Sequence, residues 1–243
     1  MSLRTEYDVW HKRVFDSDPE HEDASSQWYS LVREVLGPVA GLRVLEVACG
    51  RGGFVLELAR AGALVVGCDF SGAALRVGRE KLQPLADCAS TTALVQGDAQ
   101  NLAFADDSFD VVVSCETIEH VPDPWAALRE MYRVTRPGGK LFLTTPNYLN
   151  CMGLYELYAH FRHPGRKDDQ PYDRRQWVPQ IREYVRRGGW TIMHTDGTVH
   201  QFPFFPGKNP ISFPSLEKNH TIRKLLSPFA FHYFVVATKG SRM

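Results

Sequence analysis

Short apolar segments of strand length alternate with segments of helical periodicity from residue 43 to residue 145. Such alternation, with helices of about 10–15 residues, is typical of a parallel sheet whose two faces are covered by helices. Residues 109–115 are nearly continuous in apolar side chains, as expected for a strand that is covered on both faces. We therefore predict an α/β fold built on a single doubly wound, mostly parallel sheet. Its strands are expected at residues 43–48, 64–68, 92–96, 109–115 and 140–145, and its helices at residues 54–61, 73–82 and 125–134.

Both ends of the chain are expected to add to this sheet. Residues 5–40 read as helical, because apolar side chains recur at helical spacing until Gly37-Pro38 interrupts them. Residues 147–173 and 201–228 are rich in aromatic side chains and show little periodicity. The strands of the C-terminal part are placed at the sheet edge, and the last is expected to be antiparallel. The predicted C-terminal elements are a helix at residues 176–187 and strands at residues 190–198 and 231–238.

The composition disfavours several classes of partner. The chain carries 28 basic and 28 acidic side chains, so its formal net charge is zero. A neutral chain gives no electrostatic reason to expect nucleic acid or a membrane surface as its main partner. The sequence does not open on a charged segment followed by an apolar one, and its apolar runs are far shorter than a membrane span. We therefore expect a cytoplasmic protein with no integral membrane segment and no nucleic-acid partner, and we predict no oligomeric state.

The cysteines point to a reducing compartment. There are five, an odd number, and they form no Cys-x-x-Cys pair. We interpret them as reduced, mostly buried thiols and expect no zinc site built on them.

The turn after the first predicted strand has the clearest chemical meaning. Residues 49–53 read Cys-Gly-Arg-Gly-Gly, and glycines there let the backbone turn sharply and let a ligand approach closely. Ligands of open α/β sheets bind at the carboxyl ends of the strands, where the strand order reverses. The next two strands end near Asp69 and Asp98, so both carboxyl groups are expected at that edge. Asp69 could accept from ribose hydroxyls or cap a helix, and Asp98 could accept from an adenine amino group or stabilise a turn.

Two features of this turn disfavour a nicotinamide dinucleotide. The dinucleotide fingerprint Gly-x-Gly-x-x-Gly needs a third glycine, and Val55 stands at that position. Glu46 lies in the first strand, four residues before Gly50, where a carboxylate would repel a pyrophosphate. An acid at this place suits a cationic ligand, or it orients the glycine turn.

Five segments between residues 40 and 146, in order, resemble the motifs of the class I S-adenosylmethionine-dependent methyltransferases. The resemblance implies a Rossmann-like fold with helices on both faces of the sheet. It also implies S-adenosylmethionine as the cofactor and S-adenosylhomocysteine as the product. The segments read VLEVACGRG from residue 44, VGCDFS from residue 66, QGDAQNL from residue 96, DVVVSCE from residue 110 and RVTRPGGKL from residue 133.

The same resemblance assigns cofactor contacts to individual residues. Gly50 and Gly52 would border the methionine moiety, and Asp69 would hold the ribose hydroxyls. Phe70 would flank the adenine, whose amino edge would meet Asp98. The remaining predicted cofactor-binding residues are Glu46, Ala48 and Arg51 in the first motif, Ala99 beside Asp98, and Cys115 on the sulfonium side.

Residues 116–124 form the predicted acceptor side. They read Glu-Thr-Ile-Glu-His-Val-Pro-Asp-Pro, and one turn of helix would place Glu116 beside Glu119 and His120. Methyl transfer from a sulfonium is an in-line displacement, and an oxygen acceptor also needs its proton removed. We therefore name His120, Glu119 and Glu116 as candidate catalytic residues, with His120 as a base at neutral pH. The alternative is that Glu119 and His120 make structural hydrogen bonds between the strand and the next helix.

This acceptor segment also resembles the ubiquinone-biosynthesis O-methyltransferases and related bacterial small-molecule methyltransferases. A Glu-x-x-Glu-His arrangement occurs in small-RNA 2′-O-methyltransferases as well, where it helps to hold a divalent ion. A metal here would need further donors, such as His160 or His163, and we predict no metal site. The resemblance stops after Asn147, and residues 147–228 do not read as the substrate region of that family, which disfavours a quinone precursor as the acceptor.

The motifs suggest one methyltransferase domain over residues 1–243. Aromatic side chains after Asn147 are expected to cover the site, as in an acceptor pocket or lid. Tyr7, Trp10 and His11 either close over the cofactor from the other side or pack on the sheet edge. The predicted parts are a helical cap at 1–40, the cofactor-binding core at 41–146, an acceptor-side elaboration at 147–228, and a last edge strand with a tail at 229–243.

The sequence as a whole predicts methyl transfer from S-adenosylmethionine to a small-molecule acceptor. Transfer to oxygen is expected, and transfer to nitrogen is the second choice. A nicotinamide oxidoreductase is disfavoured by the missing third glycine and by the absence of a Tyr-x-x-x-Lys pair. A non-catalytic scaffold that keeps the fold is the third alternative. The sequence does not predict the identity of the acceptor.

Overall fold

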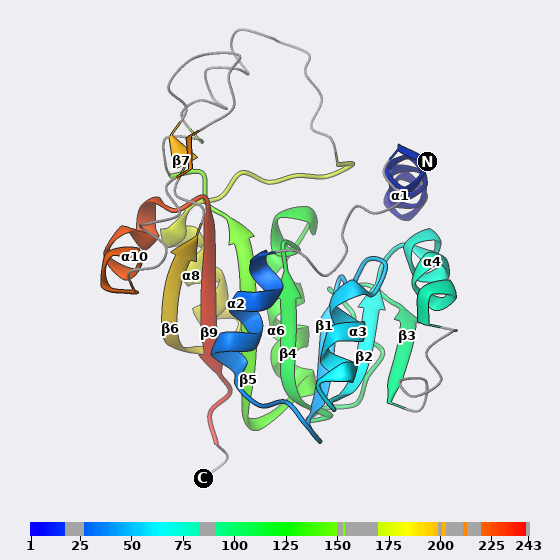
Figure 1. Cartoon of the computed structure of the whole chain (residues 1–243), viewed down its shortest axis with the longest axis horizontal. Coiled ribbons are helices and arrows are strands. Elements are labelled where there is room, and N and C mark those ends of the chain that lie inside the picture. Colours follow the sequence, from blue (N-terminus) through cyan, green and yellow to red (C-terminus); the bar gives the residue numbers. More distant parts are fainter. Residues whose placement is uncertain are drawn as a thin grey trace, which may run out of the picture.

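A seven-stranded sheet in the order β3-β2-β1-β4-β5-β9-β6 forms the centre of the protein (Figure 1). The computed structural model describes residues 1–17, 27–82, 91–149, 153, 170–198, 201–202, 211–212 and 220–241. The strands of the sheet are β1 (Arg43–Val47), β2 (Leu64–Asp69), β3 (Thr92–Gln96), β4 (Phe109–Cys115), β5 (Thr135–Pro146), β6 (Thr191–Thr198) and β9 (His232–Thr238). Two short strands, β7 (Gln201–Phe202) and β8 (Ile211–Ser212), pair separately.

The sheet is parallel from β3 to β5 and antiparallel at its C-terminal side. β1 pairs in parallel with β2 and β4, while β9 is antiparallel to both β5 and β6. The predicted doubly wound, mostly parallel sheet with an antiparallel last strand is therefore confirmed. The strand order reverses beside β1, since β2 lies on one side of it and β4 on the other. Ligands of such sheets bind in the crevice at the carboxyl ends of these two strands.

The position of the last strand differs from the prediction. β9 does not form the sheet edge: it lies between β5 and β6, so its backbone is paired on both sides. Its central residues Tyr233–Ala237 are all buried, which suits an internal strand. The edge belongs to β6, whose first half alternates with solvent and exposes Met193. The prediction that residues 229–243 contain an edge strand is thus wrong.

The start of β5 also differs from the prediction. The strand predicted at residues 140–145 begins at Thr135 instead, and Pro137-Gly-Gly139 lies within β5 as an irregularity of the ladder. Phe109 pairs with Thr135 and Val111 with Lys140, so the extra residues bulge out between the two pairs. The bulge keeps a backbone partner, because Gly138 N donates to the Lys239 carbonyl oxygen at 2.9 Å. Its φ of +76° requires the freedom of a glycine.

The helices predicted at residues 54–61, 73–82, 125–134 and 176–187 are present, with bounds that differ by no more than two residues. The helical cap is present as two helices, and residues 18–26 between them lie outside the described part of the chain. Helix α10 and the turn η2 were not predicted, because residues 201–228 have little periodicity. None of the described helices is long and apolar enough to cross a membrane. The helices and turns are α1 (Leu3–Ser17), α2 (Gln27–Leu36), α3 (Gly53–Arg60), α4 (Gly72–Leu82), η1 (Ile118–His120), α6 (Pro124–Val134), α8 (Val178–Arg187), α10 (His220–Leu226) and η2 (Ser227–Phe229).

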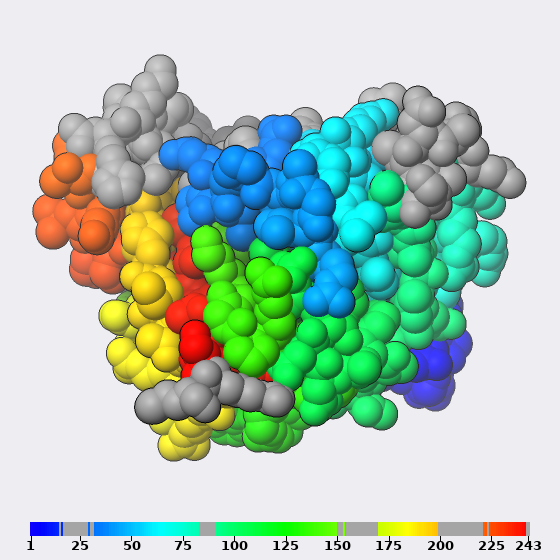
Figure 2. All heavy atoms as spheres, turned by 90° about the horizontal axis from the view of Figure 1, so that it is seen from below, coloured from blue at the N-terminus to red at the C-terminus, as the bar shows by residue number. Residues whose placement is uncertain are grey.

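Helices cover both faces of the sheet and form a core on each side. Alternate residues of β4 illustrate this, since Val112 packs with the buried faces of α6 and α8 while Val111 and Val113 pack with α2, α3 and α4. Figure 1 shows α2 and α3 in front of the strands and α6 and α8 behind them. In Figure 2, the mid-blue segment that contains α2 lies between the yellow and orange C-terminal elements and the cyan region of α3. Two covered faces leave the carboxyl ends of the strands as the place for a ligand.

Candidate active site

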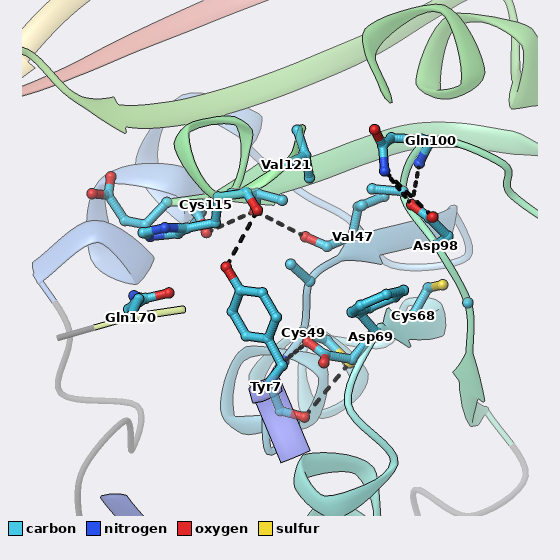
Figure 3. Close-up of a pocket in the computed structure, with 18 of the residues that line it drawn as sticks. Tyr7, Val47, Cys49, Cys68, Asp69, Asp98, Gln100, Cys115, Val121 and Gln170 are labelled. Carbon is cyan, nitrogen blue, oxygen red and sulfur yellow. Dashed lines mark hydrogen bonds between the residues drawn. The ribbon is translucent and has the colours of Figure 1, made fainter. Parts of the chain in front are cut away.

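A pocket of about 580 Å³ opens at the carboxyl ends of β1, β2, β3 and β4. Its floor is formed by the turn after β1, and its walls by the ends of β2, β3 and β4 (Figure 3). Tyr7 reaches from α1 into the middle of the pocket, with its hydroxyl directed at the loop after β4 (Figure 3). The pocket therefore lies where the reversal of the strand order predicts a ligand.

The glycine turn owes its shape to backbone conformations that few residues adopt. Ala48, Gly50 and Gly52 have φ values of +61°, +53° and +74°. The backbone N–H groups of Ala48 and Cys49 both donate to the carbonyl oxygen of Cys68, at 2.7 and 3.1 Å. The positive φ values explain why the turn is rich in glycine. The result is a sharp bend that leaves Gly50 at the pocket surface.

The carboxylates of Asp69 and Asp98 stand at the ends of β2 and β3, as predicted. Asp69 Oδ2 accepts from Gly50 N at 2.8 Å, and its Oδ1 accepts from Ser71 N at 2.8 Å. Asp98 Oδ1 accepts from the backbone and side-chain nitrogens of Gln100, at 2.8 and 3.0 Å. Both side chains line the pocket, where Figure 3 shows them on neighbouring walls. Asp69 thus serves two purposes, because it ties the glycine turn to β2 and also faces the ligand space.

The pocket contains most of the predicted site residues. Glu46 and Arg51 are buried behind its wall, with 3% and 2% of their surface exposed, and Gly52 caps helix α3. Glu119 is fully buried beneath the surface of the pocket. The predicted residues that line it are Ala48, Gly50, Asp69, Phe70, Asp98, Ala99, Cys115, Glu116 and His120.

The lining is acidic. Asp69, Asp98 and Glu116 contribute carboxylates, and no lysine or arginine of the described residues lines the pocket. His11 adds no cation at neutral pH, because burial and then the nearby charge of Arg51 lower the pKa of His11 to about 4. Such a lining favours a cationic ligand and repels phosphates.

Glu116 is held in a strained conformation at the end of β4. Its φ of +50° is unusual for a residue with a side chain. Its Oε1 accepts from Thr144 Oγ1 at 2.8 Å, and its Oε2 lies 3.0 Å from His232 Nδ1. His232 begins β9 and was not singled out from the sequence, since only the antiparallel path of β9 brings it to this edge. The carboxylate of Glu116 therefore has a defined direction at the surface of the pocket.

Glu119 and His120 belong to the short turn η1, and both make local contacts. His120 Nδ1 lies 2.8 Å from the carbonyl oxygen of Tyr172, and its Nε2 lies 3.7 Å from Glu119 Oε1. Glu119 Oε2 accepts from Thr145 Oγ1 at 2.8 Å. Burial, followed by the charge of Glu116, raises the pKa of Glu119 well above its usual range. The two side chains join the loop after β4 to β5 and to the segment around Tyr172.

Helix α1 closes one side of the pocket. Tyr7, Trp10 and His11 all line the pocket. Of the two positions considered for them, over the pocket or on the sheet edge, the structure therefore shows the first. The Tyr7 hydroxyl lies 3.2 Å from both the His120 and the Tyr172 carbonyl oxygens. Among the residues not anticipated from the sequence, Tyr29, Gln100 and Thr117 also line the pocket. Gln100 and Thr117 lie within segments that carry the family resemblance but were not named as site residues, whereas Tyr29 belongs to α2, outside every motif.

The described histidine, acidic and cysteine side chains were also considered as metal ligands and as redox groups. Within the described part of the chain, no three His, Cys, Asp or Glu side chains are grouped to hold a metal ion. His160 and His163, named as further donors, lie outside the described residues. Cys49, Cys68 and Cys115 are free thiols whose pKa is raised by burial. They are therefore protonated at neutral pH.

Comparison with known proteins gives a consistent result. A family model described as a methyltransferase domain matches residues 45–143. The demethylmenaquinone methyltransferase of Geobacillus kaustophilus is 32% identical, over 72% of this chain and 82% of that protein. The enzyme of the same name from Beutenbergia cavernae is 39% identical, over 67% of this chain and 71% of that protein. The chain spans about half the length of some other relatives, such as 46% of the Corynebacterium kroppenstedtii protein, to which it is 41% identical.

Solved structures share the fold at lower identity. A methyltransferase of Thermotoga maritima has a TM-score of 0.67 and 20% identity, covering 98% of this chain and all of that one. Phosphoethanolamine N-methyltransferase 2 of Haemonchus contortus, in complex with S-adenosyl-L-methionine, has a TM-score of 0.70 and 18% identity. That match covers 99% of this chain and 60% of the other. At these identities the likeness concerns the fold alone.

The chain belongs to the class I S-adenosylmethionine-dependent methyltransferases. This membership removes the nicotinamide oxidoreductase from the alternatives that the sequence left open. The described residues fit the cofactor of the family: two carboxylates can accept from its hydroxyl and amino groups, and a wall without lysine or arginine suits its cationic sulfonium. The close backbone turn at Gly50 also leaves room beside it for a ligand.

Proposed function

We propose that this protein transfers the methyl group of S-adenosylmethionine to a hydroxylated aromatic small molecule. The observation that carries the proposal is the acidic pocket at the reversal of the strand order, which is lined by Asp69, Asp98 and Glu116. The first two carboxylates suit the hydroxyl and amino donors of a nucleoside. The third lies next to Cys115, at the end of the strand that the family resemblance places beside the sulfonium.

In this proposal, each part of the cofactor contacts a different set of pocket residues. Gly50 borders the methionine moiety, Asp69 holds the ribose hydroxyls, and Asp98 accepts from the adenine amino group. Phe70 and Ala99 pack against the adenine ring. The buried Glu46, Arg51 and Gly52 support the turn from behind and orient Gly50. When bound, S-adenosylmethionine supplies an electrophilic methyl group on a sulfur that is already a good leaving group.

We propose that Glu116 is the base that removes the proton from the hydroxyl group of the acceptor. A phenolic hydroxyl is a weak nucleophile until its proton is removed, so a directed carboxylate in the pocket helps the reaction. Thr144 and His232 hold the two oxygens of Glu116 at 2.8 and 3.0 Å, which limits the directions in which the carboxylate can point. The side chain of Glu116 is about one quarter exposed, so an acceptor can reach it.

His120 is the alternative base. A carbonyl oxygen only accepts hydrogen bonds, so the contact with Tyr172 places a proton on Nδ1 and leaves Nε2 as the basic atom. That atom faces Glu119, which is buried and favours its neutral form. This arrangement supports a role for His120 and Glu119 in joining the loop after β4 to the segment around Tyr172. The effects of Glu116 and His120 substitutions on kcat distinguish the two candidate bases.

The acceptor class rests on the relatives and on the chemistry of the base. Several relatives at 32–44% identity are named as demethylmenaquinone methyltransferases, and a reduced quinone is a hydroxylated ring. Loss of the hydroxyl proton raises the electron density on the oxygen and on the neighbouring ring carbons. The oxygen is the first expected point of transfer, the ring carbon the second, and an amine nitrogen the third. The cytoplasmic location and the lack of a nucleic-acid partner stay predictions of the sequence.

Two measurements test the proposal. Calorimetric titration with S-adenosylmethionine, S-adenosylhomocysteine and NAD should give micromolar binding of the first two and none of NAD. The protein should then be incubated with S-adenosylmethionine and, in turn, a short-chain demethylmenaquinol, a catechol and an arylamine. Mass spectrometry detects the added methyl group, and NMR of the product shows whether it is on oxygen, carbon or nitrogen. Absence of all cofactor binding would favour the scaffold, and turnover of the amine alone would overturn the acceptor class.

A further inference from the structure

The side chain of Gln100 joins Asp98 to the start of helix α6. Its Nε2 donates to Asp98 Oδ1 at 3.0 Å and to Asp98 Oδ2 at 3.3 Å, and the backbone N of Gln100 donates to Oδ1 at 2.8 Å. At the other end of the amide, Oε1 accepts from Asp123 N at 2.9 Å. Gln100 and Asp98 both line the pocket, and Figure 3 shows the amide beside the carboxylate.

The orientation of this amide is fixed by its two partners. A backbone N–H only donates, so the oxygen of the amide must face Asp123. An ionised carboxylate only accepts, so the nitrogen of the amide must face Asp98. Asp123 is itself the N-cap of α6, since its Oδ1 accepts from Ala126 N at 3.0 Å. Gln100 therefore holds Asp98 from an anchor at the end of a helix.

The contacts with Gln100 leave one acceptor position on the carboxylate of Asp98. An ionised carboxylate offers about four lone-pair positions, two on each oxygen. Gln100 occupies two of them on Oδ1 and one on Oδ2. Within the part of the chain that the structure describes, no other hydrogen bond reaches this carboxylate. The position that remains belongs to Oδ2, so Asp98 can accept one further hydrogen bond, from a ligand.

This remaining position matches the edge of an adenine. Asp98 is only partly buried and lines the pocket between Gly97 and Ala99. The adenine of the proposed cofactor is expected at this end of the pocket. Its exocyclic amino group donates hydrogen bonds, whereas its unsubstituted ring nitrogens only accept them. The amino group is therefore the part of the base that suits Oδ2.

We propose that Gln100 is a positioning residue, which holds Asp98 so that Oδ2 accepts from the adenine amino group of the bound cofactor. The inference rests on the proposed cofactor and adds a residue that the family resemblance did not assign. Without the amide, Asp98 keeps only the backbone bond to Oδ1. The terminal torsion of an aspartate is broad, so Oδ2 is then free to turn away from the ligand. Loss of the Gln100 amide should therefore lower the preference for a base that carries an amino group.

A purely structural role of Gln100 would have a different effect. In that case the amide would only tie the turn after β3 to α6. Its loss would then weaken every ligand that contacts this turn, whether or not the ligand carries the amino group. The dependence on the amino group thus separates the two roles.

The test compares two ligands that differ only in this amino group. S-adenosylhomocysteine and its deamino analogue, in which a hydrogen atom replaces the adenine amino group, are titrated calorimetrically into the wild type and into Gln100→Met. The wild type should bind S-adenosylhomocysteine roughly 10–100-fold more tightly than the analogue, as expected for a hydrogen bond to a charged group. Gln100→Met should bind S-adenosylhomocysteine roughly tenfold more weakly than the wild type, and should change the affinity for the analogue by less than about twofold.

A second variant, Gln100→Glu, separates the two contacts of the side chain. It keeps an oxygen that can accept from Asp123 N, but it replaces the donor to Asp98 by a carboxylate that repels it. This variant should therefore lose at least as much affinity for S-adenosylhomocysteine as Gln100→Met does. Gln180→Met, on α8 and away from the pocket, is the matched control and should leave both affinities unchanged. Thermal unfolding of each variant verifies that it is folded.

The possible results lead to different conclusions. Equal weakening of the two ligands by the Gln100 substitutions, or no weakening at all, would overturn the role of Gln100 while leaving the proposed function intact. A wild type that binds the two ligands equally well would also overturn this role, but not the binding of the cofactor. A wild type that binds neither ligand would overturn both proposals.

Discussion

The imidazole Nδ1 of His232 lies 3.0 Å from Oε2 of Glu116, although the two residues are 116 positions apart in the chain. Glu116 follows β4, whereas His232 begins β9. Because β9 runs antiparallel to its neighbours, its first residue meets the carboxyl ends of the parallel strands. Glu116 has a φ of +50°, a strained backbone that the bonds to Thr144 and His232 help to hold. The relationship orients a carboxylate at the surface of the pocket, on the side that we propose for the acceptor.

If Glu116 accepts the proton of the acceptor, its replacement should act on turnover. Glu116→Gln is expected to lower kcat by roughly 10²–10⁴-fold with little change in the binding of S-adenosylhomocysteine. His120→Gln should have a much smaller effect on kcat. The measurement is the steady-state rate with the acceptor found above, together with calorimetry of the cofactor. A larger loss of kcat in the His120 variant would transfer the role of base to His120.

His232 is expected to act through Glu116, as a positioning residue. His232→Phe should lower kcat, while His232→Asn, which keeps an N–H near Nδ1, should restore part of it. When Glu116 is already Gln, the change to Phe at position 232 should have almost no further effect, because the two residues work as a unit. Additive losses in this double-mutant cycle would show that His232 affects the reaction in some other way.

Asp69 should control the affinity for the cofactor. Its carboxylate lines the pocket and also accepts from Gly50 N, so Asp69→Ala should remove the contact proposed for the ribose and loosen the glycine turn. We expect S-adenosylhomocysteine to bind about 10–100-fold more weakly, the loss typical of hydrogen bonds to a charged group. Asp106→Ala, on the exposed side of the molecule, is the matched control and should bind normally. Equal affinities of the two variants would contradict the role of Asp69.

Gly78 allows helix α4 to pack against the glycine turn. A Cβ at this position would lie 2.9 Å from the Arg51 carbonyl oxygen and 2.9 Å from Leu94 Cδ1. Gly→Ala in an exposed helix stabilises by about 1 kcal/mol, but here we expect about 1–3 kcal/mol of destabilisation from overpacking. Cofactor binding should weaken as well, since Arg51 belongs to the turn. Denaturant unfolding checks this against Gly240→Ala, where no atom lies within 4 Å.

Glu119 should make stability depend on pH. Its folded pKa is raised by burial above the usual 4.5, so the folded state keeps a proton that the unfolded chain releases. Its contribution is therefore fully present below pH 4.5 and declines as the pH rises toward the folded pKa. Glu119→Gln removes this loss and is expected to raise the midpoint of thermal unfolding by a few degrees at neutral pH. The exposed Glu183→Gln should not change it, and a lower midpoint for the Glu119 variant would contradict the argument.

The sequence alone determined the donor side of this protein. Apolar runs and glycine turns depend on neighbours close in the chain, so the parallel core and the places of Gly50, Asp69 and Asp98 followed from local pattern. Most predicted helices and strands agree with the observed bounds within two residues, because these bounds also depend on neighbours close in the chain. Helix α10 and the turn η2 were not predicted, because both are short and their main contacts are with the distant strand β6.

Only the tertiary structure decided how the acceptor side is built. The insertion of β9 between β5 and β6 depends on backbone pairing between distant segments, and no local pattern reports it. That pairing brings His232 to Glu116. The docking of α1 likewise turns Trp10 and His11 toward the pocket, where sequence periodicity left two positions open. Contacts between residues far apart in the chain are set by packing and strand order, which is why they appear only in the fold.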